Sequence, residues 1–139
     1  MPAIHRAVAT LRILGEELDP DEISGLLGHP PTNSVRKGES PAKRSGISRH
    51  VSKNGVWRLE ATLTEPENLD AQIEELTSKL TSDLKIWCNL STKYKVDLFC
   101  GWFMKETNEG VDISAHTLQA LSSRNIALAL DIYAPDSDA

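Results

Sequence analysis

Two aspartates are the residues of this chain best suited to acid–base chemistry. Asp97 and Asp131 each lie in a stretch whose alternating character predicts a β-strand. Carboxylates on neighbouring strands perturb each other's proton affinity, as a catalytic acid–base pair requires. Catalysis by this pair is the less favoured interpretation of these two residues.

The other sequence patterns that carry chemistry are missing. The glycine spacing of a phosphate-binding loop does not occur, nor does a Gly-x-Ser-x-Gly motif, and no base accompanies Cys88 or Cys100. The histidines lie on separate segments without the paired spacing of a zinc site. They are His5, His29, His50 and His116. We therefore predict no catalytic residue, no metal site and no cofactor, and the sequence leans against an enzyme.

One segment of the chain is strongly basic. Residues 36–53 contain six basic residues and one acidic residue, so they carry +5 and the rest of the chain −10 of the total of −5. Arg36, Lys37 and Arg44 are the candidate anion-binding residues of this segment. A solvated loop kept soluble by its charges is the favoured alternative. Since no aromatic residue alternates with these charges to stack on a base, nucleic acid is an improbable partner.

Composition indicates one ordinary globular domain over residues 1–139. The chain is long enough to bury a core without disulfide or metal. No apolar run approaches the roughly 20 residues of a membrane span, and residues 1–6 lack the apolar region of a signal peptide. Two widely spaced cysteines suit reduced thiols, so we expect a cytoplasmic protein without membrane contact.

The first half of the chain predicts a strand over 7–14 and a helix over 20–27. Asp19 is placed to cap this helix, Pro20 occupies its first turn, and Gly28 ends it. Residues 32–46 are rich in Ser, Gly, Pro and Lys, so we expect a mobile basic connection there. The dipeptide Asn54-Gly55 predicts a type I′ hairpin between strands 47–53 and 56–63. On that register Trp57 faces the core.

The second half predicts a helix over 69–87, which 81–83 can divide into two shorter helices. A strand over 94–104 and a helix over 114–125 follow. The last strand, 126–133, is expected to turn Leu130 and Ile132 inward. Residues 134–139 are expected to be a frayed acidic tail.

The order of elements predicts an α+β fold. It is β-α-β-β-α-β with an added α-β, which matches a ferredoxin-like sandwich with a mainly antiparallel sheet. Right-handed crossovers place the helices on one face of that sheet and leave the other open. The open face would carry Val8, Thr10, Arg12, Arg58, Glu60, Thr62, Asp97, Phe99, Phe103, Asp131 and Tyr133. Aromatic residues set among arginines and carboxylates are typical of recognition surfaces, unless a helix, the 32–46 loop or a second copy covers them.

Several segments of the chain resemble a known family. They are Leu14-Gly15, Asp19-Pro20-Asp21-Glu22-Ile23, Leu26-Leu27-Gly28, Pro31-Thr32, Lys37-Gly38-Glu39, Trp57 and Leu130-Asp131-Ile132-Tyr133. In this order they are similar to the bacterial domain-of-unknown-function family four-two-seven-nine, from about residue 7 to 133. The resemblance implies a small bacterial protein and supplies no catalytic residues. Lys37-Gly38-Glu39 has no structural role in the predicted elements and is therefore a candidate functional loop.

Two functions remain open from the sequence. The leading hypothesis is a non-enzymatic protein-interaction module, in its most specific form an immunity-type inhibitor, that binds a basic partner protein through the open face. Its binding residues would be Arg12, Arg58, Asp97, Phe99, Phe103, Asp131 and Tyr133. The alternative is a small-ligand or anion-binding domain that uses residues 36–53. A homodimer that buries the open face is a third, structural interpretation.

Overall fold

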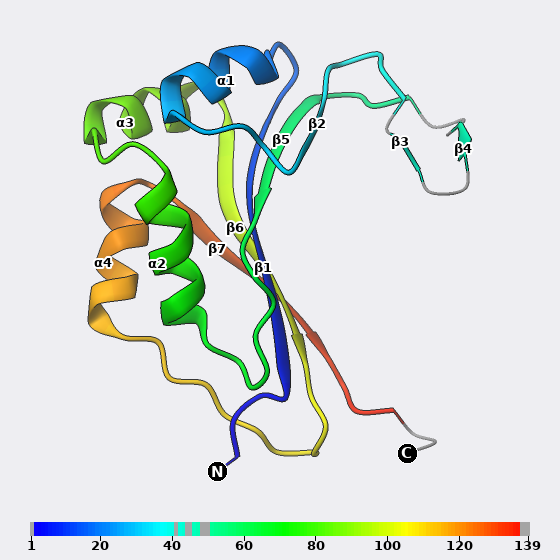
Figure 1. Ribbon diagram of the computed structural model, residues 1–139, viewed down its shortest axis with the longest axis vertical. Helices are drawn as coiled ribbons and strands as arrows, with labels where there is room; N and C mark the ends of the chain where they lie inside the picture. The colour runs from blue at the N-terminus through cyan, green and yellow to red at the C-terminus, as the bar shows by residue number, and fades with distance from the viewer. Residues whose placement is uncertain (1, 41, 44–45, 48–50, 137–139) are drawn as a thin grey trace.

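The computed structural model describes residues 2–40, 42–43, 46–47 and 51–136. Within these ranges it is an α+β protein whose main sheet has the strand order β2-β5-β1-β6-β7, with four helices (Figure 1). The elements are β1 (Arg6–Gly15), α1 (Pro20–Leu27), β2 (Asn33–Val35), β3 (Ala42–Lys43), β4 (Gly46–Ile47), β5 (Gly55–Glu60), α2 (Leu69–Lys79), α3 (Leu84–Lys93), β6 (Lys95–Phe103), α4 (Ala115–Ser123) and β7 (Ala127–Tyr133). None of the helices in the described ranges is both long and apolar enough to cross a membrane.

The central strand β1 organises the sheet. It pairs antiparallel with β5 and with β6, β2 pairs antiparallel with β5, and β7 runs parallel to β6. The residues of β1 alternate between buried and half-buried along its length, as in a strand with one covered face. All the labelled helices lie on one side of the sheet, and the small β3–β4 ribbon lies on the other (Figure 1). The prediction that helices cover a single face is confirmed.

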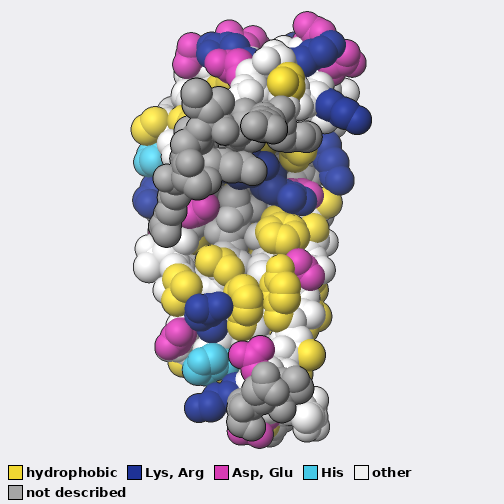
Figure 2. All heavy atoms as spheres, turned by 90° about the vertical axis from the view of Figure 1, so that its right-hand side faces the viewer, with side chains coloured by type: hydrophobic (Ala, Val, Ile, Leu, Met, Phe, Trp, Pro, Cys, Tyr) yellow, Lys and Arg dark blue, Asp and Glu magenta, His cyan; other side chains and the backbone are white. Residues whose placement is uncertain are grey.

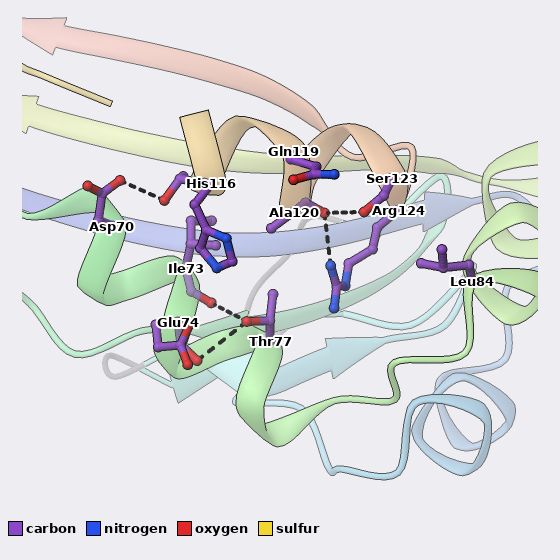
Figure 3. A pocket seen from close by; sticks show the side chains of 11 residues that line it. Asp70, Ile73, Glu74, Thr77, Leu84, His116, Gln119, Ala120, Ser123 and Arg124 are labelled. Atoms are coloured by element: carbon purple, nitrogen blue, oxygen red, sulfur yellow. Dashed lines mark hydrogen bonds between the residues drawn. The ribbon is translucent and has the colours of Figure 1, made fainter. Parts of the chain in front are cut away.

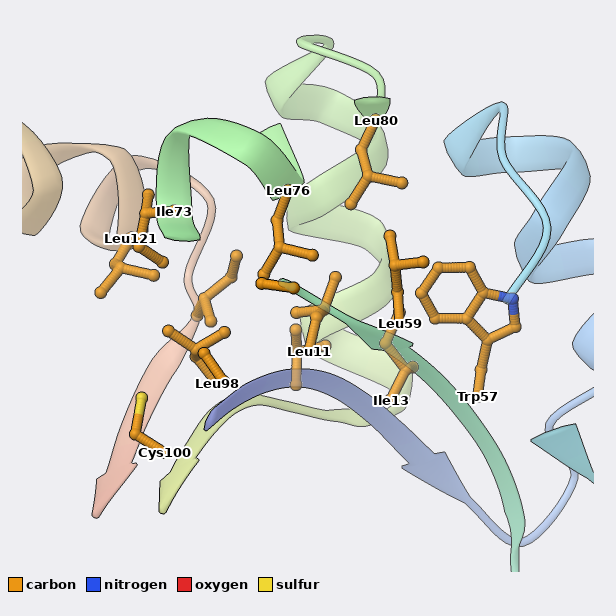
Figure 4. Close-up of a cluster of buried hydrophobic side chains, with 14 of the residues drawn as sticks. Leu11, Ile13, Trp57, Leu59, Ile73, Leu76, Leu80, Leu98, Cys100 and Leu121 are labelled. Atoms are coloured by element: carbon orange, nitrogen blue, oxygen red, sulfur yellow. The ribbon is translucent and has the colours of Figure 1, made fainter. Parts of the chain in front are cut away.

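The core fills the space between the sheet and the helices. Leu11 and Leu98, from neighbouring strands, point towards Leu76 of α2, and Trp57 of β5 packs at the side of α1 (Figure 4). The indole N–H of Trp57 donates to Ser24 Oγ of that helix at 3.1 Å, so its one polar group is satisfied. Trp57 is fully buried, as its place in the alternation predicts.

The predicted hairpin at Asn54-Gly55 is wrong. Neither residue has a positive φ, which a type I′ turn requires at both positions. Gly55 begins β5 and lies opposite Gly15, while the outer partner of β5 is β2, and residues 51–53 are not in a strand. A Cβ on Gly55 would stand 2.5 Å from the carbonyl oxygen of Leu18. This glycine therefore allows a close backbone approach and not a turn.

Residues 32–39 are not the mobile connection that composition suggests. Residues 33–35 form the edge strand β2, and the following residues form a β-turn in which Glu39 N–H donates to Arg36 O at 3.0 Å. Gly38, at φ 87°, supplies the positive φ of that turn. The backbone carbonyl of Ser52 accepts from Gly38 N–H, and the backbone N–H of Ser52 donates to Glu39 O, both at 2.9 Å. Lys37-Gly38-Glu39 thus has a structural role, whereas predictions about residues 44–45 and 48–50 lie outside the described residues.

The structure has two helices where the sequence predicts one long helix. This is the alternative in which residues 81–83 divide the segment. α2 ends at Lys79, and α3 begins after Asp83, whose carboxylate accepts from Lys85 N–H at 3.0 Å. Between them, Thr81 N–H donates to the carbonyl of Leu27 at the end of α1. This bond to another helix replaces an intrahelical one, which explains why the helix stops although its apolar spacing continues.

The last strand is correctly placed but more exposed than its pattern predicts. Leu130 and Ile132 share the helix side of the sheet with the buried Cys100 and Trp102, because the register sets these pairs side by side. They are nevertheless 43% and 53% exposed. The strand lies at the sheet edge, beyond the cover that the helices provide.

Candidate functional site: the open face of the sheet

The open face is the side of the sheet that carries no helix. Figure 2 looks onto it and shows apolar side chains gathered across its middle, with charged side chains between them. The residues predicted for partner binding all point to this side, as their cross-strand neighbours require. They are Arg12, Arg58, Asp97, Phe99, Phe103, Asp131 and Tyr133. Their placement is thus as predicted, while their part in binding stays a prediction.

A buried ion pair lies at the upper end of this face. Arg12 of β1 lies directly across from Asp97 of β6 and donates to both carboxylate oxygens, at 2.8 and 2.7 Å. The side chain of Asp97 is 3% exposed and that of Arg12 is 26% exposed. The hydrogen bonds to Asp97 raise the pKa of Arg12, although burial opposes the shift. The guanidinium carbon also lies 4.5 Å from the ring centre of Phe99. Arg12 is therefore fixed in position by a carboxylate and an aromatic ring.

A second arginine–aromatic cluster lies at the other end of the face. The guanidinium carbon of Arg6 is 4.1 Å from the ring centre of Phe103, which stacks on Tyr133 at 4.6 Å and 6°. The hydroxyl of Tyr133 donates to Asp131 at 2.6 Å, and this bond raises the pKa of Tyr133. Cation, two rings and carboxylate thus form one continuous layer over β1, β6 and β7.

The surface between the two arginine–aromatic clusters lies lower than the clusters themselves, because few side-chain atoms project from it. Gly101 contributes no side chain there, and Val8 and Phe103 occupy the space next to it. Beside Phe103 and Tyr133 the surface is hollowed by about 380 Å³, with Arg6, Met104 and Glu65 among the lining residues. The arrangement offers flat rings, a hollow and oriented guanidinium groups, which are means of recognition rather than of bond breaking.

Asp97 and Asp131 do not form a carboxylate pair. The register places Asp131 beside Gly101, four residues along β6 from Asp97, which separates them by roughly 13 Å. Each has its own partner, Arg12 for Asp97 and Tyr133 for Asp131. The structure gives no support to acid–base catalysis by this pair.

The candidate anion-binding residues are already occupied by carboxylates. Arg36 donates to Asp19 at 2.9 Å and to Asp21 at 2.8 Å, at the N-terminus of α1. Lys37 pairs with Glu16, and this contact raises the pKa of Lys37. Arg44 lies outside the described residues. The acidic neighbours disfavour an incoming anion at Arg36 and Lys37.

No cluster of three potential metal ligands occurs among the residues that the structure describes. Comparison with protein families gives one result. The model of DUF4279, a domain of unknown function, matches residues 3–135. The chain belongs to the DUF4279 family. No curated protein and no solved structure matches it.

Family membership confirms the resemblance seen in the sequence, and the structure explains several of its residues. Asp19 accepts from Asp21 N–H as N-cap of α1, and Gly28, at φ 81°, closes that helix. Lys37-Gly38-Glu39 forms the turn that follows β2. In this DUF4279 chain these segments thus build the fold around α1, whereas Asp131 and Tyr133 lie on the open face.

A cleft between α2 and α4 escaped sequence reasoning (Figure 3). It holds about 430 Å³ and is lined by Glu74 and Thr77 of α2 and by His116 and Arg124 on the other side. In the described part of the chain, Arg124 Nε is buried without a hydrogen-bond partner, while Nη1 donates to Ala120 O at 3.1 Å. Because these polar residues resemble the solvent side of two helices, the sequence holds no signal that distinguishes a cleft.

Hydrogen bonds from the N-terminus of α4 to Asp70 of α2 join the two helices at one end of this cleft. Asp70 of α2 accepts from Thr117 Oγ1 at 2.6 Å and from Ser114 N–H and Oγ at 3.2 and 3.1 Å. These bonds, that of Thr117 foremost, lower the pKa of Asp70. Asp70 therefore joins two helices, which is a structural role.

Proposed function

We propose that this protein is a non-enzymatic interaction module that binds a partner protein through the open face. The observation that carries the proposal is the pair of arginine–aromatic units, Arg12 on Phe99 and Arg6 on Phe103, on a sheet face without a helix. Arginine and aromatic residues are enriched at protein interfaces and among the residues that dominate binding energy.

Pre-organisation favours this interpretation. An arginine side chain loses rotamer freedom when a partner immobilises it, at a cost of about 0.5–1.5 kcal/mol. Asp97 already holds the Arg12 guanidinium by two hydrogen bonds, and Tyr133 is already stacked on Phe103. A partner would therefore meet side chains that have little freedom left to lose.

The charges on the open face indicate what kind of partner surface it suits. Three arginines, one lysine and three carboxylates point to it, so its charges nearly cancel, although the whole chain carries −5. These residues are Arg6, Arg12, Arg58, Lys95, Glu60, Asp97 and Asp131. A basic partner would be attracted at long range by the net charge, while the contact itself suits a surface of mixed polar and aromatic groups. The two free cysteines support a cytoplasmic setting.

We interpret the fold as ferredoxin-like with an added α–β unit. The order β2-β5-β1-β6, antiparallel throughout, supports this interpretation, since it places β5 between β1 and β2 as a split βαβ unit does. On this interpretation α3 and the β3–β4 ribbon are insertions, and α4 with β7 is the addition.

Site-specific photocrosslinking in the native host tests the proposed function. A benzoylphenylalanine at Thr10, in the middle of the open face, should give a discrete adduct with one partner protein. Combining it with Phe103→Ser should weaken the adduct strongly, because the half-buried ring that Arg6 and Tyr133 contact is lost. The matched control places the same probe at Leu26, an exposed position on α1, where no adduct should form. Equal adducts at both positions, or none at Thr10, would refute the proposal.

A further inference from the structure

β7 is an edge strand without the features that prevent pairing. No strand in the described ranges lies along its outer side, since β6 occupies its inner side. The opposite edge strand, β2, has three residues and follows Pro30 and Pro31. β7 has seven residues, contains neither proline nor lysine, and carries one charge, that of Asp131. Natural edge strands avoid association by being short or by carrying such residues.

The backbone groups on this edge can be assigned. Met104 N–H donates to Tyr133 O at 3.0 Å, so the polar groups of Tyr133 face β6. The N–H and C=O of one residue point to the same side of a strand, and the side alternates along the chain. Leu128, Leu130 and Ile132 therefore direct their N–H and C=O groups outward.

The same three residues carry the apolar side chains of this edge. Their side chains lie on the helix side of the sheet, where Leu130 and Ile132 are 43% and 53% exposed. Leu118 of α4 is 49% exposed. Helical spacing places it on the flank of α4 opposite the residues that line the α2–α4 cleft, which is the flank towards β7. Unpaired backbone and exposed aliphatic groups thus coincide along one edge.

We propose that β7 pairs with β7 of a second copy of this chain, antiparallel, about a twofold axis at Leu130. In this register Leu128 lies opposite the second copy's Ile132, and Asp131 lies opposite its Ala129. About six hydrogen bonds form, because every outward group of the three residues meets a partner. Aliphatic side chains face aliphatic side chains, and the two Asp131 carboxylates are not directly opposed.

The outward groups of β7 are self-complementary in this register, and this is the reason for proposing a second copy as the occupant. An axis at Leu128 or Ile132 would leave outward groups of the strand unpaired, whereas the axis at Leu130 uses all of them. Seven residues span about 23 Å, so the strand contact needs added area from Leu118 and its surroundings to make a stable dimer. The sheet then continues from one copy to the next, and both open faces lie on the same side. The dimer does not depend on the proposed function.

Sedimentation equilibrium of the full chain tests this inference. The wild type should be a dimer, and Leu130→Lys should raise the dimer dissociation constant by at least about 100-fold, because an ammonium group would meet its own copy at the axis. Leu26→Lys is the matched control, since Leu26 is similarly exposed at 39% but lies on α1. It should remain a dimer. A monomeric wild type, or a Leu130→Lys variant that dimerises normally, would overturn the proposal.

A cross-linking experiment decides the case in which Leu130→Lys fails to fold. In a Cys88→Ser background, Leu130→Cys should be joined to its second copy by a short bismaleimide, because opposed Cα atoms lie about 5.5 Å apart in this register. Ser82→Cys, an exposed position in the α2–α3 connection, should give no dimer band. Absence of the band for Leu130→Cys would contradict the proposed register.

Discussion

Removing the guanidinium of Arg12 should destabilise the fold far more than removing that of Arg58. Arg12→Met keeps the apolar stem over Phe99 but leaves the carboxylate of Asp97, 3% exposed, without its two hydrogen bonds. Loss of one partner of a buried ion pair costs about 3–5 kcal/mol. Because the Arg12 side chain is 26% exposed, water can replace part of the interaction, and we expect about 3 kcal/mol.

Urea unfolding followed by tryptophan fluorescence measures this loss. All three tryptophans are buried, so their emission reports the global transition. With a slope of about 2 kcal/mol per molar urea, the midpoint should fall by about 1.5 M. Arg58→Met is the matched control, because Arg58 makes one exposed hydrogen bond, of 3.3 Å, to Asn33. We expect a change within about 0.5 kcal/mol for it.

A double-mutant cycle isolates the ion pair from other effects. Asp97→Asn removes the charge that needs Arg12, so Arg12→Met should cost only about 1 kcal/mol in that background. The coupling free energy is then about 2 kcal/mol. If Arg12→Met costs the same in both backgrounds, or less than about 1 kcal/mol in the wild type, the interpretation of Arg12–Asp97 as a buried pair is refuted.

Three further predictions concern thiols, glycines and acid stability. Ellman's reagent should label Cys88 but not Cys100 in the native protein at pH 8, because burial raises the pKa of Cys100 to about 12; labelling of both without denaturant would contradict this. Gly38→Ala should cost about 1 kcal/mol in urea unfolding because of the positive φ, whereas Gly25→Ala, inside α1 with open space around it, should stabilise by a few tenths to about 1 kcal/mol. Asp70→Asn should lose about 0.5–1 kcal/mol at neutral pH. Since the folded pKa of Asp70 lies below its unfolded value of 3.8, that difference should be full above about pH 5 and disappear as the pH falls through the folded pKa; a constant difference down to pH 2 would refute the assignment.

The faces of the strands could be predicted from the sequence, whereas the partners of the strands could not. Trp57 and Arg58 lie on the sides that alternation predicts, even though the turn thought to set their register does not exist. Alternation depends only on the pleat, so it is independent of the strand next to β5. The edge strand β2 cannot be recognised from the sequence, because it has only three residues and such a short segment shows no periodicity.

The largest error in the predicted fold concerns Gly55, which the sequence places in a tight turn. Asn54-Gly55 has the composition of a tight turn, but Gly55 is needed where β5 passes the backbone of Leu18, a contact between distant segments. The same limit applies to the open face. Its composition could be listed from the sequence, but the stacking of Arg6 on Phe103 and the pairing of Arg12 with Asp97 depend on cross-strand register. The α2–α4 cleft depends on how two helices pack, which no local pattern records.

The paired hydrogen bonds between Ser52 and the Gly38-Glu39 turn have a consequence for engineering. They join the two ends of the segment between β2 and β5. The position at which the chain enters β5 therefore does not depend on the length of that segment. Closing a longer loop from such an anchored base adds little entropy cost, about 0.6 kcal/mol for each doubling. A peptide tag inserted between these two ends should therefore leave the sheet intact, and it would lie on the side of the sheet that carries the β3–β4 ribbon and the arginine–aromatic surface (Figure 1).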